Sequence, residues 1–347
     1  MKKTAVLLFM IFFAPFVSPA LAGDAGIVPL PKDMDTLTLE NYVEAVKDTA
    51  AMGANATLLA PNWREMEPQP SSFDFDKPIG GALYSISEGM SQLYLNLQII
   101  NTIKRELPPD LSLSRWDDPK LLERFEALIK ALKDQKQLAP LCVSIGNEVD
   151  VYFESHPDEL EPYLSFLTSA RRVIRKYFGN IPVGVTVTFE GTLKDRLQII
   201  QKLAEKSDIL YFTYYPVIDF KILDFKDIPK HLEKMKSLAG DKKIVIQEIG
   251  FPSGTLIGSG KEKQAEFFKT ALPVFLKDGQ VDTVFVFALH DFSPGVCNNL
   301  LGYYAASGWP QDFQSKFKDF LCTLGLRDSE GIEKPALSEV RKILKQK

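Results

Sequence analysis

Two glutamates, one hundred positions apart, each follow a short apolar run. Glu148 ends the segment Leu-Cys-Val-Ser-Ile-Gly-Asn-Glu, and Glu248 ends the segment Ile-Val-Ile-Gln-Glu. In both segments a predicted buried strand gives way to polar and turn-forming residues. In a barrel of parallel strands, such positions form the rim where catalytic side chains gather. Two carboxyl groups that face each other there are the groups that glycoside hydrolysis requires.

A single glutamate at a strand end has a simpler explanation, which is a salt bridge at the rim. A charged side chain directly after an apolar strand is costly unless it reaches a partner or a polar cavity. By our count Glu148 ends the fourth strand and Glu248 the seventh. Because strand ends of a closed barrel point toward one shared pocket, the pair favours a catalytic interpretation over two unrelated salt bridges.

The alternation of strands and helices predicts the elements that position these glutamates. Near-continuous apolar runs are typical of a parallel sheet that is covered on both faces. Seven such runs and a weaker first one give eight predicted strands, at Gly26–Leu30, Ala56–Ala60, Tyr94–Ile100, Leu141–Ile145, Val183–Thr188, Ile209–Thr213, Ile244–Gln247 and Val284–Leu289. The alternation predicts an α/β fold of the (β/α)8 TIM barrel class in a single domain. An open doubly wound sheet is disfavoured because the sequence has no Gly-x-Gly-x-x-Gly turn.

Segments of helical period lie between the strands. Apolar residues fall on one face between Leu121 and Leu132, with Asp117 or Asp118 as the expected cap and Pro119 in the first turn. Further helices are predicted at 158–177, 196–205, 227–238, 262–276 and 336–345, and Pro273 is expected to kink or shorten the one at 262–276. The stretches Pro61–Gly81 and Ser293–Pro310 are predicted to be long rim loops.

The two glutamate segments resemble a known superfamily. Gly146-Asn147-Glu148-Val149 and Glu248-Ile249-Gly250-Phe251-Pro252-Ser253-Gly254 are similar to the motifs of retaining (β/α)8 glycosidases of clan A. They look most like the β-1,3-glucanase family, in which a Trp commonly stands where this sequence has Phe251. Tyr214-Tyr215-Pro216, at the end of the predicted sixth strand, also fits the superfamily.

The resemblance implies a role for each matching residue. Glu148 is expected to be the general acid and base, with a pKa raised by burial and by the neighbouring carboxylate. Glu248 is expected to be the nucleophile, held in its ionised form by hydrogen bonds. Asn147 is expected to bind the sugar 2-hydroxyl, and either Tyr214 or Tyr215 to donate a hydrogen bond to Glu248.

Aromatic side chains near predicted strand ends and in rim loops suit a carbohydrate ligand, because their flat faces stack on sugar C–H groups. As a set they mildly favour sugar binding, although each one alone is better explained as core or loop packing: Trp63, Trp116, Phe251, Phe292 and Trp309. His290-Asp291, at the end of the eighth strand, is a candidate for binding a substrate hydroxyl or for forming a rim pair. Arg64 is a candidate partner for the nucleophile. The segment Val286–Leu289 lacks the Trp that is frequent in clan A.

The N-terminus indicates export. Lys2 and Lys3 precede an apolar run that ends before Ala20-Leu21-Ala22, which is typical of a signal peptide cleaved after residue 22. A transmembrane anchor is the alternative, but the run is short and Pro15 interrupts it. We therefore expect residues 23–347 to form a secreted or periplasmic catalytic domain with no membrane span after signal cleavage.

Composition limits the expected partners and cofactors. Without residues 1–22 the chain has 39 basic and 45 acidic residues, which argues against nucleic acid as a partner. None of the three histidines has a metal-motif partner nearby, so neither a metal nor a cofactor is expected. Cys142 lies in a predicted buried strand and is expected to be an inert thiol. Whether Cys297 and Cys322 form a disulfide is left open.

The leading hypothesis is an exported retaining glycoside hydrolase that cleaves β-linked oligo- or polysaccharides by double displacement. One alternative is a non-catalytic carbohydrate-binding protein on the same scaffold. Another is a transglycosylase that uses the same two glutamates. The sequence leaves open the sugar, the linkage, internal or terminal cleavage, and the oligomeric state.

Overall fold

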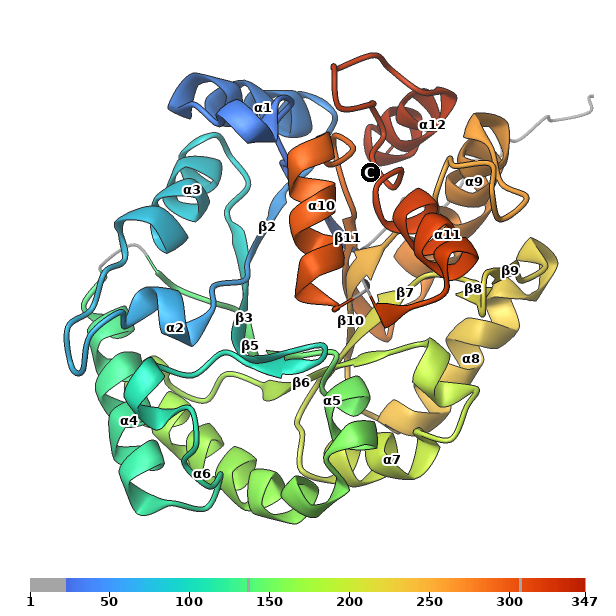
Figure 1. Ribbon diagram of the computed structural model, residues 1–347. Coiled ribbons are helices and arrows are strands. Elements are labelled where there is room, and N and C mark those ends of the chain that lie inside the picture. The colour runs from blue at the N-terminus through green and yellow to red at the C-terminus, as the bar shows by residue number, and fades with distance from the viewer. Residues whose placement is uncertain (1–22, 136–137, 306–307, 347) are drawn as a thin grey trace, which may run out of the picture.

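The computed structural model describes residues 23–135, 138–305 and 308–346, so the predicted signal peptide at 1–22 lies outside the described residues. Eight parallel strands follow one another around a barrel in the order β1-β11-β10-β7-β6-β5-β3-β2 (Figure 1). Their bounds are β1 Asp24–Ile27, β2 Ala56–Leu59, β3 Gln92–Asn101, β5 Cys142–Asn147, β6 Val183–Thr188, β7 Leu210–Tyr214, β10 Ile244–Ile249 and β11 Val281–Val286. The predicted (β/α)8 barrel is confirmed.

Asn55 joins the first and last members of this strand order, β1 and β2. Its backbone N–H donates to the Ala25 carbonyl oxygen at 2.9 Å, and its Oδ1 accepts from the Ala25 backbone N–H at 2.9 Å. Its Nδ2 also donates to Asp24 at 2.6 Å. One asparagine thus satisfies backbone groups that would otherwise lie at an open sheet edge.

In the part of the chain that the structure describes, eight helices alternate with the strands, and these helices form the outer ring in Figure 1. They are α1 Leu39–Ala51, α3 Asp76–Ser87, α4 Pro119–Lys133, α6 Leu160–Phe178, α7 Leu197–Glu205, α8 Ile228–Ala239, α9 Lys261–Lys277 and α12 Pro335–Leu344. In α4 the Asp118 side chain caps the helix by accepting from the Lys120 N–H at 2.9 Å, and Pro119 stands in the first turn, as predicted. No described helix is long and apolar enough to cross a membrane.

Further elements lie between the alternating strands and helices of the barrel. The helices are α2 Trp63–Met66, α5 Val149–Ser155, α10 Pro294–Tyr303 and α11 Gln311–Leu321, with single turns at Met34–Thr36, Pro109–Leu111, Pro157–Glu159, Glu190–Thr192 and Phe225–Asp227. Strand β4, Lys104–Arg105, pairs antiparallel with β3, and β8, Val217–Ile218, forms a hairpin with β9, Lys221–Ile222. In Figure 1, α10 and α11 stand inside the ring of outer helices.

Two predictions about local structure were wrong. The expected loop Pro61–Gly81 contains α2 and the first turns of α3, and the expected loop Ser293–Pro310 contains α10. The helix predicted at 262–276 is present as α9, and it continues beyond Pro273 to Lys277, so of the two expected effects of this proline the structure excludes shortening. The buried residues of α9 on both sides of the proline, such as Phe268 and Phe275, hold this helix in place by packing.

The barrel interior changes from apolar to polar along its axis. One cluster of buried side chains comprises Ala56, Tyr94, Cys142, Ile209, Tyr211, Val245 and Phe285. Cys142 accepts a hydrogen bond from the Tyr211 hydroxyl, and burial raises the pKa of its thiol to about 12, which fits the predicted inert thiol. Further along the strands the interior residues are Asn96, Ser144, Thr186 and Gln247. This buried polar layer lies beneath the polar floor of the pocket described next, and Gln247 is hydrogen-bonded to the pocket residue Asn147.

Candidate active site

A pocket of about 430 Å³ lies at the carboxyl ends of the barrel strands. Its polar lining comes from the ends of β3, β5, β6, β7 and β10, and includes both Glu148 and Glu248. The volume lies within the usual range for a small-molecule site. The structure therefore brings the two sequence-predicted glutamates to one pocket at the end of the barrel where catalytic residues of this fold gather.

The backbone around Glu148 turns sharply from β5 into α5. Gly146 has a φ of 93°, and a Cβ at this position would lie 2.5 Å from the Val149 side chain. Only glycine fits there, because it has no side chain to collide and tolerates positive φ. Glu148 itself has a φ of 47°, a conformation that non-glycine residues rarely adopt outside functional sites and tight turns. This turn presents the Glu148 carboxyl to the pocket.

Two threonines hold the Glu148 carboxyl group. The Thr213 hydroxyl donates to its Oε1 at 2.7 Å, and the Thr102 hydroxyl donates to its Oε2 at 2.8 Å. Burial raises the pKa of Glu148, and this effect outweighs the opposing effects of the two hydroxyls and of the Arg196 charge. A carboxyl group with a raised pKa retains its proton nearer to neutral pH, as a general acid must.

Glu248 follows an irregularity in β10. The register with β7 shifts between Ile246 and Glu248, so that Glu248 stands opposite Thr213. The Tyr215 hydroxyl donates to the Glu248 Oε2 at 2.6 Å. The Tyr215 ring lies so close to Gly250 that a Cβ on residue 250 would approach it to 2.6 Å. The glycine in the Glu-Ile-Gly motif therefore makes room for the tyrosine that orients the glutamate.

The pKa of Glu248 is raised to about 7. Burial is the largest cause, the negative charge of Glu148 is the second, and the hydrogen bonds from Tyr215 and Gln247 act in the opposite direction. The two carboxyl groups are therefore close enough for each to affect whether the other ionises.

A buried hydrogen-bond network connects the residues that precede the two glutamates. The Gln247 Nε2 donates to the Asn147 Oδ1 at 2.7 Å, and the Gln247 Oε1 accepts from Asn96 at 2.8 Å and from Thr186 at 2.7 Å. Asn147 lines the pocket, and its Nδ2 donates to Asn101 at 3.2 Å. This network ties β5 to β10 directly below the carboxyl groups and fixes their relative position.

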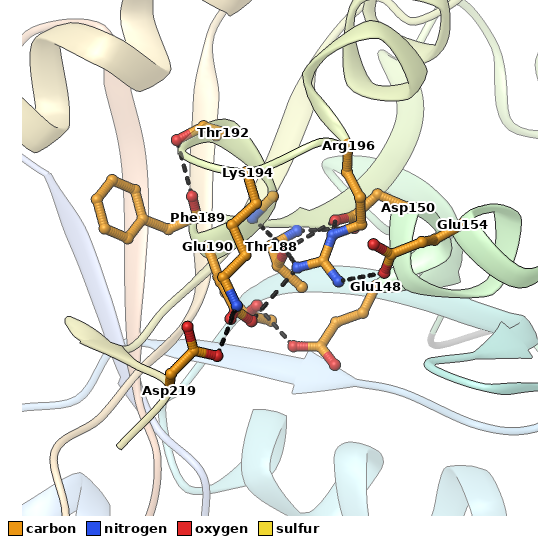
Figure 2. A network of polar contacts seen from close by, with 12 residues as sticks. Glu148, Asp150, Glu154, Thr188, Phe189, Glu190, Thr192, Lys194, Arg196 and Asp219 are labelled. Carbon is orange, nitrogen blue, oxygen red and sulfur yellow. Dashed lines mark hydrogen bonds and ion pairs between the residues drawn. The ribbon is translucent and has the colours of Figure 1, made fainter. Parts of the chain in front are cut away.

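A charged network flanks the pocket beside Glu148 (Figure 2). The Arg196 guanidinium is buried among the carboxylates of Asp150, Glu154 and Glu190 at distances of 3.1, 3.1 and 3.3 Å. Burial raises the pKa of Asp150 to about 6, against the effect of the Arg196 charge. The network anchors the loop after β6 to helix α5, next to Glu148.

Four predicted binding residues lie elsewhere. Trp63 is fully buried and donates through its indole N–H to Glu67 at 2.8 Å, and Phe251 is buried against Phe225 and Phe267. Neither ring lines the pocket, so the structure favours core packing over sugar binding as the explanation of each ring.

The Tyr214 hydroxyl is paired with the His231 ring at 2.9 Å, outside the barrel, so of the two candidate tyrosines it is Tyr215 that contacts Glu248. His290 is buried, with its Nδ1 2.8 Å from the Leu30 carbonyl oxygen, and does not line the pocket.

The structure also shows where the remaining candidate residues from the sequence lie relative to the pocket. Trp116 is buried and donates to Glu159, and Asp291 pairs with Lys334 at 2.7 Å. Arg64 points toward Glu106, 3.8 Å away, and is not among the residues that line the pocket. Of the five aromatic residues considered in the sequence, Phe292 lines the pocket. Trp309 packs against Phe313 and Phe317, which line the pocket themselves.

Cys297 and Cys322 form a disulfide between α10 and the end of α11.

Sequence reasoning missed several pocket residues. Thr102 and Thr213 hold Glu148, and Arg196 lies beside it, but nothing in the local sequence marks Thr102 or Arg196. Thr213 carried a weak signal, as a hydroxyl at the end of an apolar run. Among the described residues, no group of three or more His, Cys, Asp or Glu side chains has an arrangement that could hold a metal ion.

Comparison with known proteins shows which solved structures share this fold. No family model and no curated protein sequence matches the chain. Among solved structures, the exo-β-1,4-mannosidase Op5Man5 from Opitutaceae bacterium strain TAV5 is 16% identical with a TM-score of 0.67. The match covers 93% of this chain and 59% of that one. The chain thus spans less than two thirds of that mannosidase.

Two other solved structures cover more of their own length. A GH5_18 protein from Streptomyces cattleya in complex with GlcNAc is 16% identical, with a TM-score of 0.67 over 94% of this chain and 80% of that one. Xylanase 10B from Thermotoga petrophila RKU-1 in complex with xylobiose is 17% identical, with a TM-score of 0.65 over 94% of both chains. At this level of identity the likeness establishes the shared barrel fold.

Proposed function

We propose that this protein is an exported retaining glycoside hydrolase that acts on β-linked glycans. The proposal depends chiefly on the two carboxyl groups that end the fourth and seventh barrel strands and line one pocket, where the charge of Glu148 raises the pKa of Glu248. The solved structures with the same fold include a β-mannosidase and a xylanase, which supports this reaction class. Export is supported by the signal-like residues 1–22 and by the disulfide, which suits an oxidising compartment.

The proposal assigns a role to one of the two glutamates in each step of the double displacement. In the first step the Glu248 carboxylate attacks the anomeric carbon while protonated Glu148 donates its proton to the departing glycosidic oxygen. In the second step the Glu148 carboxylate takes a proton from water, which attacks the same carbon and releases Glu248. Thr102 and Thr213 orient Glu148, and Tyr215 orients Glu248.

A substrate panel tests the proposal. We expect the protein to hydrolyse at least one member of a set of aryl β-glycosides and β-linked oligosaccharides. The first product, followed by proton NMR, should keep the β configuration. An α product would contradict the retaining mechanism. Binding without cleavage across the whole panel would favour a non-catalytic carbohydrate-binding protein, and transfer of the sugar mainly to another sugar would favour a transglycosylase.

Removal of one hydroxyl group should shift the pH dependence. The Tyr215 hydroxyl lowers the pKa of Glu248, so Tyr215→Phe should raise that pKa. Because Glu248 must be ionised to attack, the acid limb of the kcat/KM profile should move to higher pH. We also expect kcat to fall by roughly 10- to 100-fold, because the nucleophile loses its orienting partner.

The neighbouring residue provides a matched control. Tyr214→Phe removes a hydroxyl that is paired with His231 outside the pocket, so its acid limb should coincide with that of the unmodified protein. Equal shifts in both variants would contradict the assignment of Tyr215 as the orienting residue.

A further inference from the structure

The pocket has one apolar wall in addition to its polar floor. The wall is formed by side chains of α10, of the residue directly after it and of α11 that line the pocket, namely Leu300, Tyr304, Phe313, Phe317, Phe320 and Leu321. Apart from the Tyr304 hydroxyl these side chains carry no hydrogen-bonding group. A wall for sugar rings needs polar groups beside its aromatic faces to satisfy the sugar hydroxyls. This wall instead suits a group that has no hydroxyls.

Helix α11 keeps its apolar residues accessible. Phe313, Phe317 and Phe320 recur at helical spacing, yet none of the residues of α11 is fully buried, and Phe313 is 43% exposed. An amphipathic helix that packs on a core normally buries such a face. Aromatic surface that stays accessible beside a pocket indicates a binding surface.

The wall is preformed by its own contacts. Trp309 packs edge-on against Phe313 and Phe317 at ring distances of 5.0 and 5.1 Å, and Phe220 meets Phe313 at 4.8 Å. The disulfide between Cys297 and Cys322 ties α10 to the end of α11. A rigid wall loses little conformational freedom when an apolar group binds to it.

The wall reaches both carboxyl groups. Tyr304 lines the same pocket as Thr102, the donor to Glu148, and the negative charges of Glu148 and Glu248 both help raise the pKa of Tyr304. At the other end, the Phe320 ring lies 5.7 Å from the ring of Tyr215, the donor to Glu248. A molecule that contacts the wall therefore also lies against the proposed catalytic pair.

We propose that the substrate is an amphiphilic β-glycoside, whose sugar binds the polar floor and whose aglycone is an apolar alkyl or aryl group packed against α10 and α11. This inference rests on the proposed glycosidase function. Glu148 would then protonate the oxygen that joins the sugar to the apolar group, and this group leaves as an alcohol or phenol while the sugar is transferred to Glu248.

A chain-length series tests the substrate class. With the sugar that the panel selects, kcat/KM is measured for the methyl, butyl, hexyl and octyl β-glycosides below their critical micelle concentrations. Burial of each methylene should raise kcat/KM by about two- to four-fold until the wall is covered. A parallel comparison of benzyl with methyl glycoside distinguishes an aryl from an alkyl preference. Equal kcat/KM values for the methyl, octyl and benzyl compounds would overturn the proposal.

Variants of the wall provide a second test. Phe317→Ala and Phe313→Ala should each lower the ratio of kcat/KM for octyl over methyl glycoside by about five- to ten-fold. Leu113→Ala removes an equally apolar side chain that is 95% exposed and lies outside this pocket, so its ratio should stay unchanged. The ratio is an internal control for any loss of folded protein. A ratio that does not change in the wall variants would contradict the assignment of the wall.

A binding measurement separates failure of this inference from failure of the proposed function. In the double variant Glu148→Gln, Glu248→Gln, calorimetry should show at least roughly tenfold tighter binding of octyl than of methyl glycoside. If the double variant prefers the octyl glycoside but the unmodified protein hydrolyses no substrate, the proposed hydrolase function is contradicted and the apolar wall is not. If the unmodified protein hydrolyses its substrate but the double variant binds octyl and methyl glycosides equally, the apolar wall is contradicted and the hydrolase function is not.

Discussion

Replacement of Glu248 by alanine is expected to reduce kcat on an activated aryl β-glycoside by roughly 10⁴-fold or more, because the variant has no group to form the covalent intermediate. The fold should survive. The Glu248 side chain lies at the pocket, and its main structural partner is the single hydroxyl of Tyr215. Circular dichroism and thermal unfolding check the fold, and steady-state kinetics measure the loss.

Two further measurements make this test specific to a nucleophile. Azide added to Glu248→Ala should occupy the space of the missing carboxylate, attack the anomeric carbon and yield an α-glycosyl azide. Glu330→Ala removes an exposed glutamate outside the pocket and should retain full activity. Retention of substantial activity by Glu248→Ala would exclude the assigned nucleophile, and formation of a β-azide would assign the nucleophile to another residue.

The barrel was predictable from the sequence because its strands are buried on both faces. Runs such as Val284–Leu289 are apolar at every position, which distinguishes them from the amphipathic helices between the strands. Helices α3 and α10 were missed for an equally local reason. Helix α3 contains Gly80 and Gly81, and α10 begins Pro294-Gly295, so their intrinsic propensities favour loops. Packing against neighbouring elements overrides that preference, and a local pattern does not contain this packing.

The pair of glutamates was also predictable from the sequence, but the direction in which the side chains of nearby strand-end residues point was not. At the end of a strand, successive side chains point to opposite faces, so a shift of one residue exchanges the inside of the barrel for the outside. Tyr214 points outward to His231 on α8, whereas Tyr215 points inward to Glu248. Phe251 likewise follows the seventh strand and turns outward into the core.

Residues that hold Glu148 were beyond sequence reasoning because their contacts are distant along the chain. Thr102 lies 46 positions away and Thr213 lies 65 positions away. Only the closure of the barrel brings the ends of β3 and β7 to the two sides of the same carboxyl group.

Replacement of Glu148 by glutamine should produce a loss of activity that depends on the leaving group. Glutamine keeps the size of the side chain. Its amide oxygen can accept from one of Thr102 and Thr213 and its NH2 group can donate to the other, but it has no acidic proton to donate. For alkyl β-glycosides, whose leaving groups need protonation, kcat/KM should fall by roughly 10²- to 10⁴-fold. For a dinitrophenyl β-glycoside, whose leaving group departs as an anion, the first step should change little, and added azide should accelerate the second.

Glu148→Gln should also shift the pKa of Glu248, which would not be expected if Glu148 had only a structural role. The negative charge of Glu148 is one of the causes that raise the pKa of Glu248 to about 7. Glutamine removes that charge, so the pKa of Glu248 should fall and the acid limb of kcat/KM for the dinitrophenyl substrate should move to lower pH. This direction is opposite to that expected for Tyr215→Phe, which removes a hydrogen bond that lowers the same pKa. If both limbs moved the same way, or if alkyl and dinitrophenyl substrates lost activity equally, Glu148 would not be the proton donor that acts beside Glu248.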